Sequence, residues 1–181
     1  MEIRLKRYYG DAEVTKSVME VWMDGETQPR MVCEAREVGF ADYEASFPGA
    51  SRVCLPRGRW RMKVGQSPYG AMGLRVARCP GHRQVYVGHR WARQMFEGAV
   101  LVGEVETLSP EDPLCPADIS PMRGRPCGGG ADGERLREMK ERRIVNGDVV
   151  FEKLNGLVYE AWGRGEEFWM VVENGEMSGF A

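Results

Sequence analysis

The first hundred residues alternate between short runs of β-forming residues and strong turn signals, and this pattern constrains the fold most. Ile3 and Leu5 alternate with charged residues, and a run over residues 18–23 ends at Asp24-Gly25. An Asp-Gly pair favours a tight hairpin, so residues 30–36 are the expected partner strand. Alternating polarity predicts strands with one buried face. Further strands are expected at residues 59–64, 74–76, 85–87 and 99–102.

One amphipathic helix is expected after these strands. It begins at Asn146-Gly147-Asp148, where Asn146 or Asp148 can cap it, and Gly163 suits its end. Residues 167–172 then form a closing strand that ends at Asn174-Gly175. This order predicts a β-dominated α+β domain spanning 1–181, with the helix packed across the sheet. The apolar stripe of the helix consists of Val150, Leu154, Leu157, Val158 and Ala161.

Residues 108–132 differ in kind from the rest of the chain. They hold five of the ten prolines, a Gly128-Gly129-Gly130 run, and Cys115 and Cys127. Such a segment has too few large apolar residues to build its own core, so we expect a surface insertion. Residues 38–51 are expected to form a long loop, and the charged residues 134–143 a solvated helical turn.

Composition excludes some classes of function. A hydrophobic fraction of 43% suits a sizeable core, and the net charge of −2 shows none of the basic excess expected of a nucleic-acid-binding domain. Neither a membrane span nor a signal peptide is visible, which predicts cytoplasmic synthesis without membrane insertion. The five cysteines are therefore expected to be free and mostly buried.

Residues 85–103 resemble the site of a cysteine-nucleophile enzyme that lacks its cysteine. Two valine-rich runs flank a polar connection, and a Glu97-Gly98 turn leads into the second run. The Gly98 turn could supply oxyanion donors and His89 a base, but Ala99 carries only a methyl group where the thiol would stand. Among the five cysteines, Cys79 lies nearest in the sequence to the segment 85–103, and it is the candidate for a relocated nucleophile.

Other candidate sites are weaker. Cys79 and His82 have the spacing of zinc ligands, but no second pair completes a four-ligand set, so neither a metal nor another cofactor is predicted. Carboxylate pairs at Glu34/Glu37 and Glu104/Glu106 do not by themselves indicate glycoside hydrolysis. Cys115 and Cys127 form a disulfide only if the protein reaches an oxidising compartment.

The tryptophans suggest both core and surface roles. Trp60 and Trp169 fall in strand patterns and are expected in the core. Arg90, Trp91 and Arg93 form a cluster of the residue types that dominate binding surfaces for proteins or glycans.

The chain resembles an uncharacterised domain family of phages, prophages and Bacteroidetes genomes that is itself similar to the L,D-transpeptidases. The resemblance covers most of the chain outside residues 108–132. It rests on Arg7-Tyr8-Tyr9, Cys33-Glu34-Ala35-Arg36, Pro56-Arg57-Gly58-Arg59-Trp60, Ser67-Pro68, the terminal segment 150–172, and the signature segment 85–103 with Gly98, Leu101, Val102 and Gly103. It implies an L,D-transpeptidase-like β-sandwich or barrel.

The catalytic positions of the family are lost in this chain. Its histidine position falls on Gly88, with His89 one residue later, its cysteine position on Ala99 and its arginine position on Leu101. A shift of one residue along a strand turns a side chain to the opposite face. The resemblance therefore implies a non-catalytic structural or binding component of a phage particle or phage-derived injection apparatus, with protein partners. The alternatives are a peptidoglycan-active hydrolase or transpeptidase with a relocated nucleophile, and a non-catalytic cell-wall-binding module.

Overall fold

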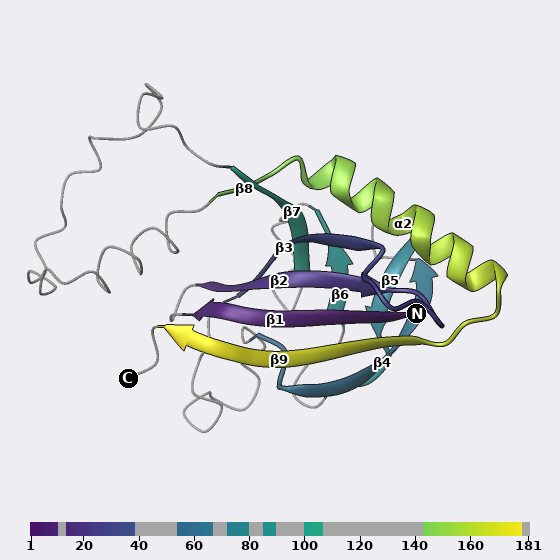
Figure 1. Ribbon diagram of the computed structural model, residues 1–181, viewed down its shortest axis with the longest axis horizontal. Coiled ribbons are helices and arrows are strands. Elements are labelled where there is room, and N and C mark those ends of the chain that lie inside the picture. Colours follow the sequence, from purple (N-terminus) through teal and green to yellow (C-terminus); the bar gives the residue numbers. More distant parts are fainter. Residues whose placement is uncertain are drawn as a thin grey trace, which may run out of the picture.

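Eight strands close into a β-barrel in the computed structural model (Figure 1), which describes residues 1–10, 14–38, 54–66, 72–79, 85–89, 100–106 and 143–178. One helix accompanies the strands within these residues. The elements are β1 (Glu2–Gly10), β2 (Val14–Trp22), β3 (Met31–Val38), β4 (Gly58–Gln66), β5 (Met72–Val76), β6 (Val85–Gly88), β7 (Val100–Glu106), β8 (Arg143–Val145), α2 (Gly147–Gly163) and β9 (Phe168–Ser178).

Strand pairing runs in the order β3-β2-β1-β9-β4-β5-β6-β7 and closes where β7 pairs with β3. The closing contact is antiparallel and places Ala35 opposite Val102. Two pairs are parallel, namely β1 with β9 and β6 with β7. The short strand β8 adds to β7 outside this ring. The predicted β-dominated fold with one helix is confirmed for the described residues, and its sheet is a barrel.

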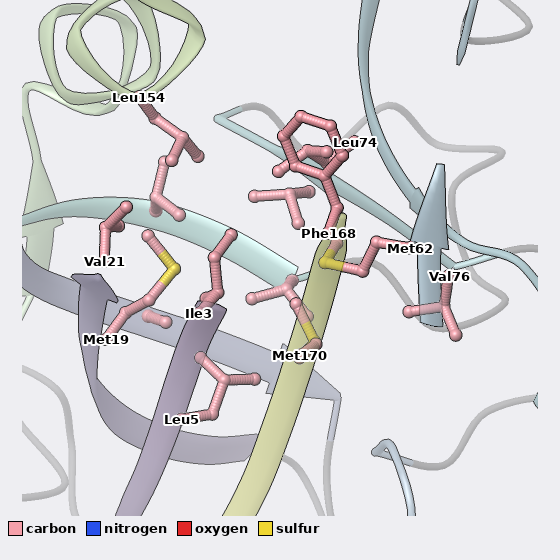
Figure 2. Close-up of a cluster of buried hydrophobic side chains, with 14 of the residues drawn as sticks. Ile3, Leu5, Met19, Val21, Met62, Leu74, Val76, Leu154, Phe168 and Met170 are labelled. Atoms are coloured by element: carbon pink, nitrogen blue, oxygen red, sulfur yellow. The ribbon is translucent and has the colours of Figure 1, made fainter. Parts of the chain in front are cut away.

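Side chains of alternate residues fill the barrel interior. Ile3 and Leu5 point inward from β1, Met19 and Val21 from β2, and Met170 from β9, and all of them are buried (Figure 2). The opposite faces of β1 and β4 carry exposed or half-buried residues, which confirms the predicted alternation for these two strands. Strand β7 differs, because Val100, Leu101 and Val102 are all buried.

Helix α2 packs against β7 and β5 and buries the predicted stripe. Val150, Leu154, Val158 and Ala161 are buried, and Leu157 packs against the same cluster at partial burial. Leu154 points from the helix toward the side chains of β1 and β2 (Figure 2). The helix therefore packs across the sheet, as predicted, and covers the core of the barrel that this sheet forms.

The ends of α2 differ from the expected caps. Asn146 occupies the N-cap position in a left-handed conformation (φ 51°), but its side chain makes no capping bond and instead donates to Glu104 Oε2 at 2.9 Å. Asp148 lies within the first turn. The left-handed residue after the helix is Gly165 rather than Gly163, with φ 72°. Hydrogen bonds from Gly165 N to Trp162 O and from Glu166 N to Ala161 O complete a Schellman motif.

Several predicted boundaries are wrong. Strand β2 begins at Val14, four residues early, and β7 continues to Glu106 beyond the expected end at residue 102, with Gly103 paired to Glu34. Strand β9 continues past Asn174-Gly175 to Ser178, with an irregularity in its pairing to β1 after Asn174. Gly175 lies against the Arg7 carbonyl there, where an added Cβ would stand 2.9 Å from the oxygen.

The loop expected at 38–51 lies outside the described residues apart from Val38, which ends β3. The charged segment 134–143 also lies outside them apart from Arg143, which begins β8. The insertion at 108–132 falls wholly outside the described residues. No described helix is long and apolar enough to cross a membrane.

Candidate functional site

The sequence-predicted site falls at the parallel pair β6–β7. Gly88, at the histidine position, pairs with Leu101, at the arginine position, and both residues are buried. Ala99 and the cluster of Arg90, Trp91 and Arg93 lie outside the described residues, as do His82, Cys115 and Cys127.

His89 follows β6 directly and packs beside the helix. Its ring centroid lies 4.9 Å from that of Phe151 in α2, with the two rings tilted by 36°. The first residue of the helix, Gly147, lies against the His89 backbone, where an added Cβ would be 3.1 Å from the carbonyl oxygen. This ring is therefore held as a packing element between β6 and α2.

The described thiols are buried and unreactive in character. Burial, with a smaller contribution from the Glu37 carboxylate, raises the pKa of the Cys79 thiol to about 11. Burial likewise raises the pKa of Cys33 to about 12 and that of Cys54 above its ordinary value. Since the thiolate is the nucleophilic form, these three cysteines are protonated at neutral pH and lack the activation that cysteine catalysis requires. The prediction of free, buried thiols is confirmed for these three.

A buried ion pair crosses the barrel interior between β1 and β3. Arg7 Nε donates to Glu37 Oε2 at 3.0 Å, and Arg7 Nη2 donates to Glu37 Oε1 at 2.9 Å. Both side chains are almost fully excluded from solvent. Leu55 completes the arrangement, because its carbonyl oxygen accepts from Arg7 Nη2 and its N–H donates to Glu37 Oε1 at 2.9 Å. The pair thus ties the segment entering β4 to two strands of the barrel.

Two hydroxyl groups lie in the same interior layer. Ser17 stands opposite Arg7 in the β1–β2 ladder, and Thr15 stands opposite Glu37 in the β2–β3 ladder. Both hydroxyls and Arg7 Nη1 are buried without a hydrogen-bond partner among the described atoms. The layer combines matched charges with uncharged hydroxyls, which suits a structural polar layer.

Sequence reasoning missed this layer, although one signal was present. Arg7 lies two residues after Leu5 and four after Ile3, so it falls on the buried face of β1, and Glu37 falls in the same way on the buried face shared by Cys33 and Ala35. Two opposite charges at positions expected to be buried, one on each strand, indicate an ion pair in the interior.

A cationic and aromatic surface covers the outer face of β4 and its neighbours. Trp169 of β9 is not a core residue as predicted, because it lies on this outer face between two arginines. Arg59 Cζ lies 4.3 Å from the ring centroid of Trp169, and Arg61 Cζ lies 5.9 Å from it. Trp60 points the other way and packs against the core at partial burial, as expected.

A groove of about 930 Å³ adjoins this surface. Its lining includes the cations Arg61, Lys63 and Arg78 and the rings of Trp162 and Phe168. The turn between α2 and β9 forms one wall, and the exposed side of β4 forms another.

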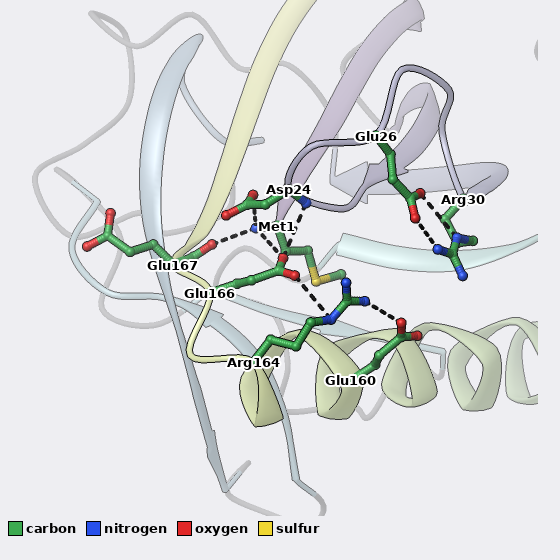
Figure 3. A network of polar contacts seen from close by, with 8 residues as sticks. All are labelled: Met1, Asp24, Glu26, Arg30, Glu160, Arg164, Glu166 and Glu167. Atoms are coloured by element: carbon green, nitrogen blue, oxygen red, sulfur yellow. Dashed lines mark hydrogen bonds and ion pairs between the residues drawn. The ribbon is translucent and has the colours of Figure 1, made fainter.

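The acidic residues of the groove are already paired. Glu167 Oε1 accepts from Arg61 Nη2 at 2.7 Å. Glu166 Oε2 lies 3.0 Å from the ammonium of Met1, which also donates to Asp24 Oδ1 at 2.6 Å (Figure 3). Arg164 Nε lies 3.5 Å from Glu166 Oε1. Both carboxylates therefore have cationic partners, and Glu2 Oε2 lies 3.5 Å from Arg59 Nη2, so Lys63 and Arg78 are the lining cations without a carboxylate partner among the described residues.

Metal ligands do not gather in the described part of the chain, where no group of three His, Cys, Asp or Glu side chains could hold an ion. No known protein family matches the chain, and neither a curated protein nor a solved structure is significantly similar to it.

Proposed function

We propose that this chain is a non-catalytic domain with an L,D-transpeptidase-like fold that serves as a structural or binding component of a phage or phage-derived apparatus. One observation carries the proposal. Where a cysteine nucleophile is expected, the sequence has Ala99, and the candidate for a relocated nucleophile, Cys79 just before the segment 85–103, is buried and protonated. A thiol in that state is a poor replacement for the lost nucleophile.

The environment of His89 supports the same proposal. A catalytic base needs a ring nitrogen within hydrogen-bond reach of the nucleophile. The ring of His89 instead packs against Phe151, and its backbone lies against the start of α2. This packing limits the movement of the half-buried ring toward a substrate.

Incubation with purified muropeptides, followed by mass spectrometry, tests the absence of catalysis. We expect unchanged muropeptides, and no labelling of Cys33, Cys54 or Cys79 in the folded protein by an iodoacetamide probe at pH 7. Ser substitution at each of the five cysteines provides the control. Turnover that a single such substitution abolishes would overturn the proposal, and loss with Cys79→Ser in particular would establish the relocated nucleophile. Saturable muropeptide binding without turnover would instead identify a cell-wall-binding module.

A further inference from the structure

We propose that the outer face of β4 and β5, with the groove beside it, binds an extended, carboxylate-rich segment of a partner protein. This surface consists of Arg59, Arg61, Lys63, Arg75 and Arg78, together with Trp162 and Trp169. We call it the β4 cationic face. The inference does not rest on the absence of catalysis, because peptide binding and turnover are separate measurements.

The arrangement of charge is the first argument. Lys63 and Arg75 stand directly opposite each other in the antiparallel β4–β5 ladder. Like charges at such positions destabilise a sheet. No ion pair joins Lys63, Arg75 or Arg78 to a carboxylate of the described residues. A carboxylate from a partner would relieve this repulsion and gain charge-assisted hydrogen bonds.

The spacing of the cations is the second argument. Arg59, Arg61 and Lys63 occupy alternate positions of one strand, so they project from the same face. Alternate residues of a strand repeat about every 6.8 Å, which is twice the rise of about 3.4 Å per residue. An extended peptide with acidic residues at alternate positions has the same repeat. Its carboxylates can therefore meet successive cations of β4 without a change in either backbone.

The aromatic residues provide the third argument. Trp162 is 56% exposed at the end of α2 and lines the groove, while Trp169 lies beneath the guanidinium of Arg59. Tryptophan and arginine dominate the energetics of protein interfaces because they combine large apolar contact with directed hydrogen bonds. The ion pair of Arg61 with Glu167 is weak, since both side chains are 59% exposed and such a pair contributes little to the free energy of folding. Arg61 can therefore exchange this partner for a carboxylate of the peptide.

A long phosphate polyanion fits this surface less well. The chain as a whole has a net charge of −2, so the field beyond the β4 cationic face does not favour a polymer of negative charge. A short acidic segment places its charge only where the cations lie.

Fluorescence anisotropy with a labelled ten-residue peptide of alternating glutamate and serine tests the proposal. We expect saturable binding that weakens about tenfold with Lys63→Glu or Arg78→Glu, and weakens similarly when the glutamates of the peptide become glutamine. Lys153→Glu is the matched control, because Lys153 is also an exposed lysine but lies in the middle of α2 outside the groove lining. It changes the net charge by the same amount as Lys63→Glu and should leave affinity within about twofold.

Three results would overturn the inference. They are the absence of saturable binding, an equal loss of affinity in the Lys153→Glu control, and tighter binding of a ten-nucleotide single strand that Lys63→Glu abolishes. Circular dichroism and thermal unfolding of each variant verify folding, and Lys63→Gln provides a milder variant if the charge reversal reduces stability. Trp162→Ala should weaken peptide binding severalfold without changing the charge.

Discussion

Replacing Glu37 with glutamine keeps the volume of the side chain and removes the charge that balances Arg7 inside the barrel. The guanidinium then remains buried with an uncharged amide in place of its carboxylate partner. Its pKa in the native protein is lowered by burial and raised more strongly in sum by the Coulomb and hydrogen-bond contributions, chiefly from Glu37, for a net increase. Arginine is effectively always protonated in proteins, so Arg7 stays charged in the variant, and the cost of burying that charge is no longer offset.

The magnitude follows from the contacts. Glu37 accepts two hydrogen bonds from Arg7, at 3.0 and 2.9 Å, and a third from Leu55 N at 2.9 Å. Breaking a buried pair by removing one partner costs about 3–5 kcal/mol. A domain of this size loses roughly 2–4 °C in Tm per kcal/mol. We therefore expect Glu37→Gln to lower Tm by about 10 °C, leaving a folded but weakened barrel.

Urea denaturation of a double-mutant cycle measures this effect. Arg7→Met alone should be similarly destabilising, whereas Arg7→Met combined with Glu37→Leu should cost about 2 kcal/mol less than the sum of the single changes. Arg61→Met removes an exposed pair with Glu167 and should change the free energy of unfolding by less than about 1 kcal/mol. The reasoning is refuted if Glu37→Gln costs no more than Arg61→Met, or if the cycle is additive.

Three further predictions concern packing and ionisation. Leu154→Ala should lower the free energy of unfolding in urea by about 2–5 kcal/mol, because this leucine is 1% exposed beneath α2. Gly147→Ala should lower the free energy of unfolding by about 1–3 kcal/mol, since the new Cβ would lie 2.9 Å from a carbonyl oxygen. Gly156→Ala in the same helix meets open space and should raise the free energy of unfolding by about 0.5–1 kcal/mol. A higher Tm for Gly147→Ala than for Gly156→Ala would contradict this prediction. The thiols of Cys33 and Cys79 have raised pKa values, so the folded state retains protons that the unfolded state releases. The free energy of unfolding should therefore fall as pH rises from about 9 toward 11–12, and serine replacement of both should flatten this part of the pH titration.

Local patterns predicted the strands well because each carries its own signal of alternating polarity. The antiparallel pairing of β2 with β3 was predicted from Asp24-Gly25, where Gly25 has a φ of 81° that few other residues adopt. The connection is longer than a tight hairpin turn, because residues 23–30 join the two strands. The buried stripe of α2 likewise depends only on spacing within the helix. Strand ends were predicted less well, since Gly103 pairs with the distant strand β3, and β9 continues past Asn174-Gly175 through an irregularity in its pairing with β1.

The candidate sites also combine features that the sequence shows with features that only the fold shows. The absence of a thiol at Ala99 is visible in the sequence, whereas the burial of Cys79 and the packing of His89 on Phe151 require the fold. The β4 cationic face has a local component, because its cations alternate along one strand. Its repulsive pairing with β5 and its stacking on Trp169 depend on which strands are neighbours.

By itself the sequence determined the class of the fold, because one buried face per strand and one apolar stripe per helix are encoded within a few residues of each other. Only the tertiary structure decided that the sheet closes, since β1 pairs in parallel with β9 and β3 meets β7 across long stretches of chain. It also decided that Arg7 and Glu37 meet. Their partnership depends on register between β1, β2 and β3, and a shift of one residue would turn either charge out to solvent.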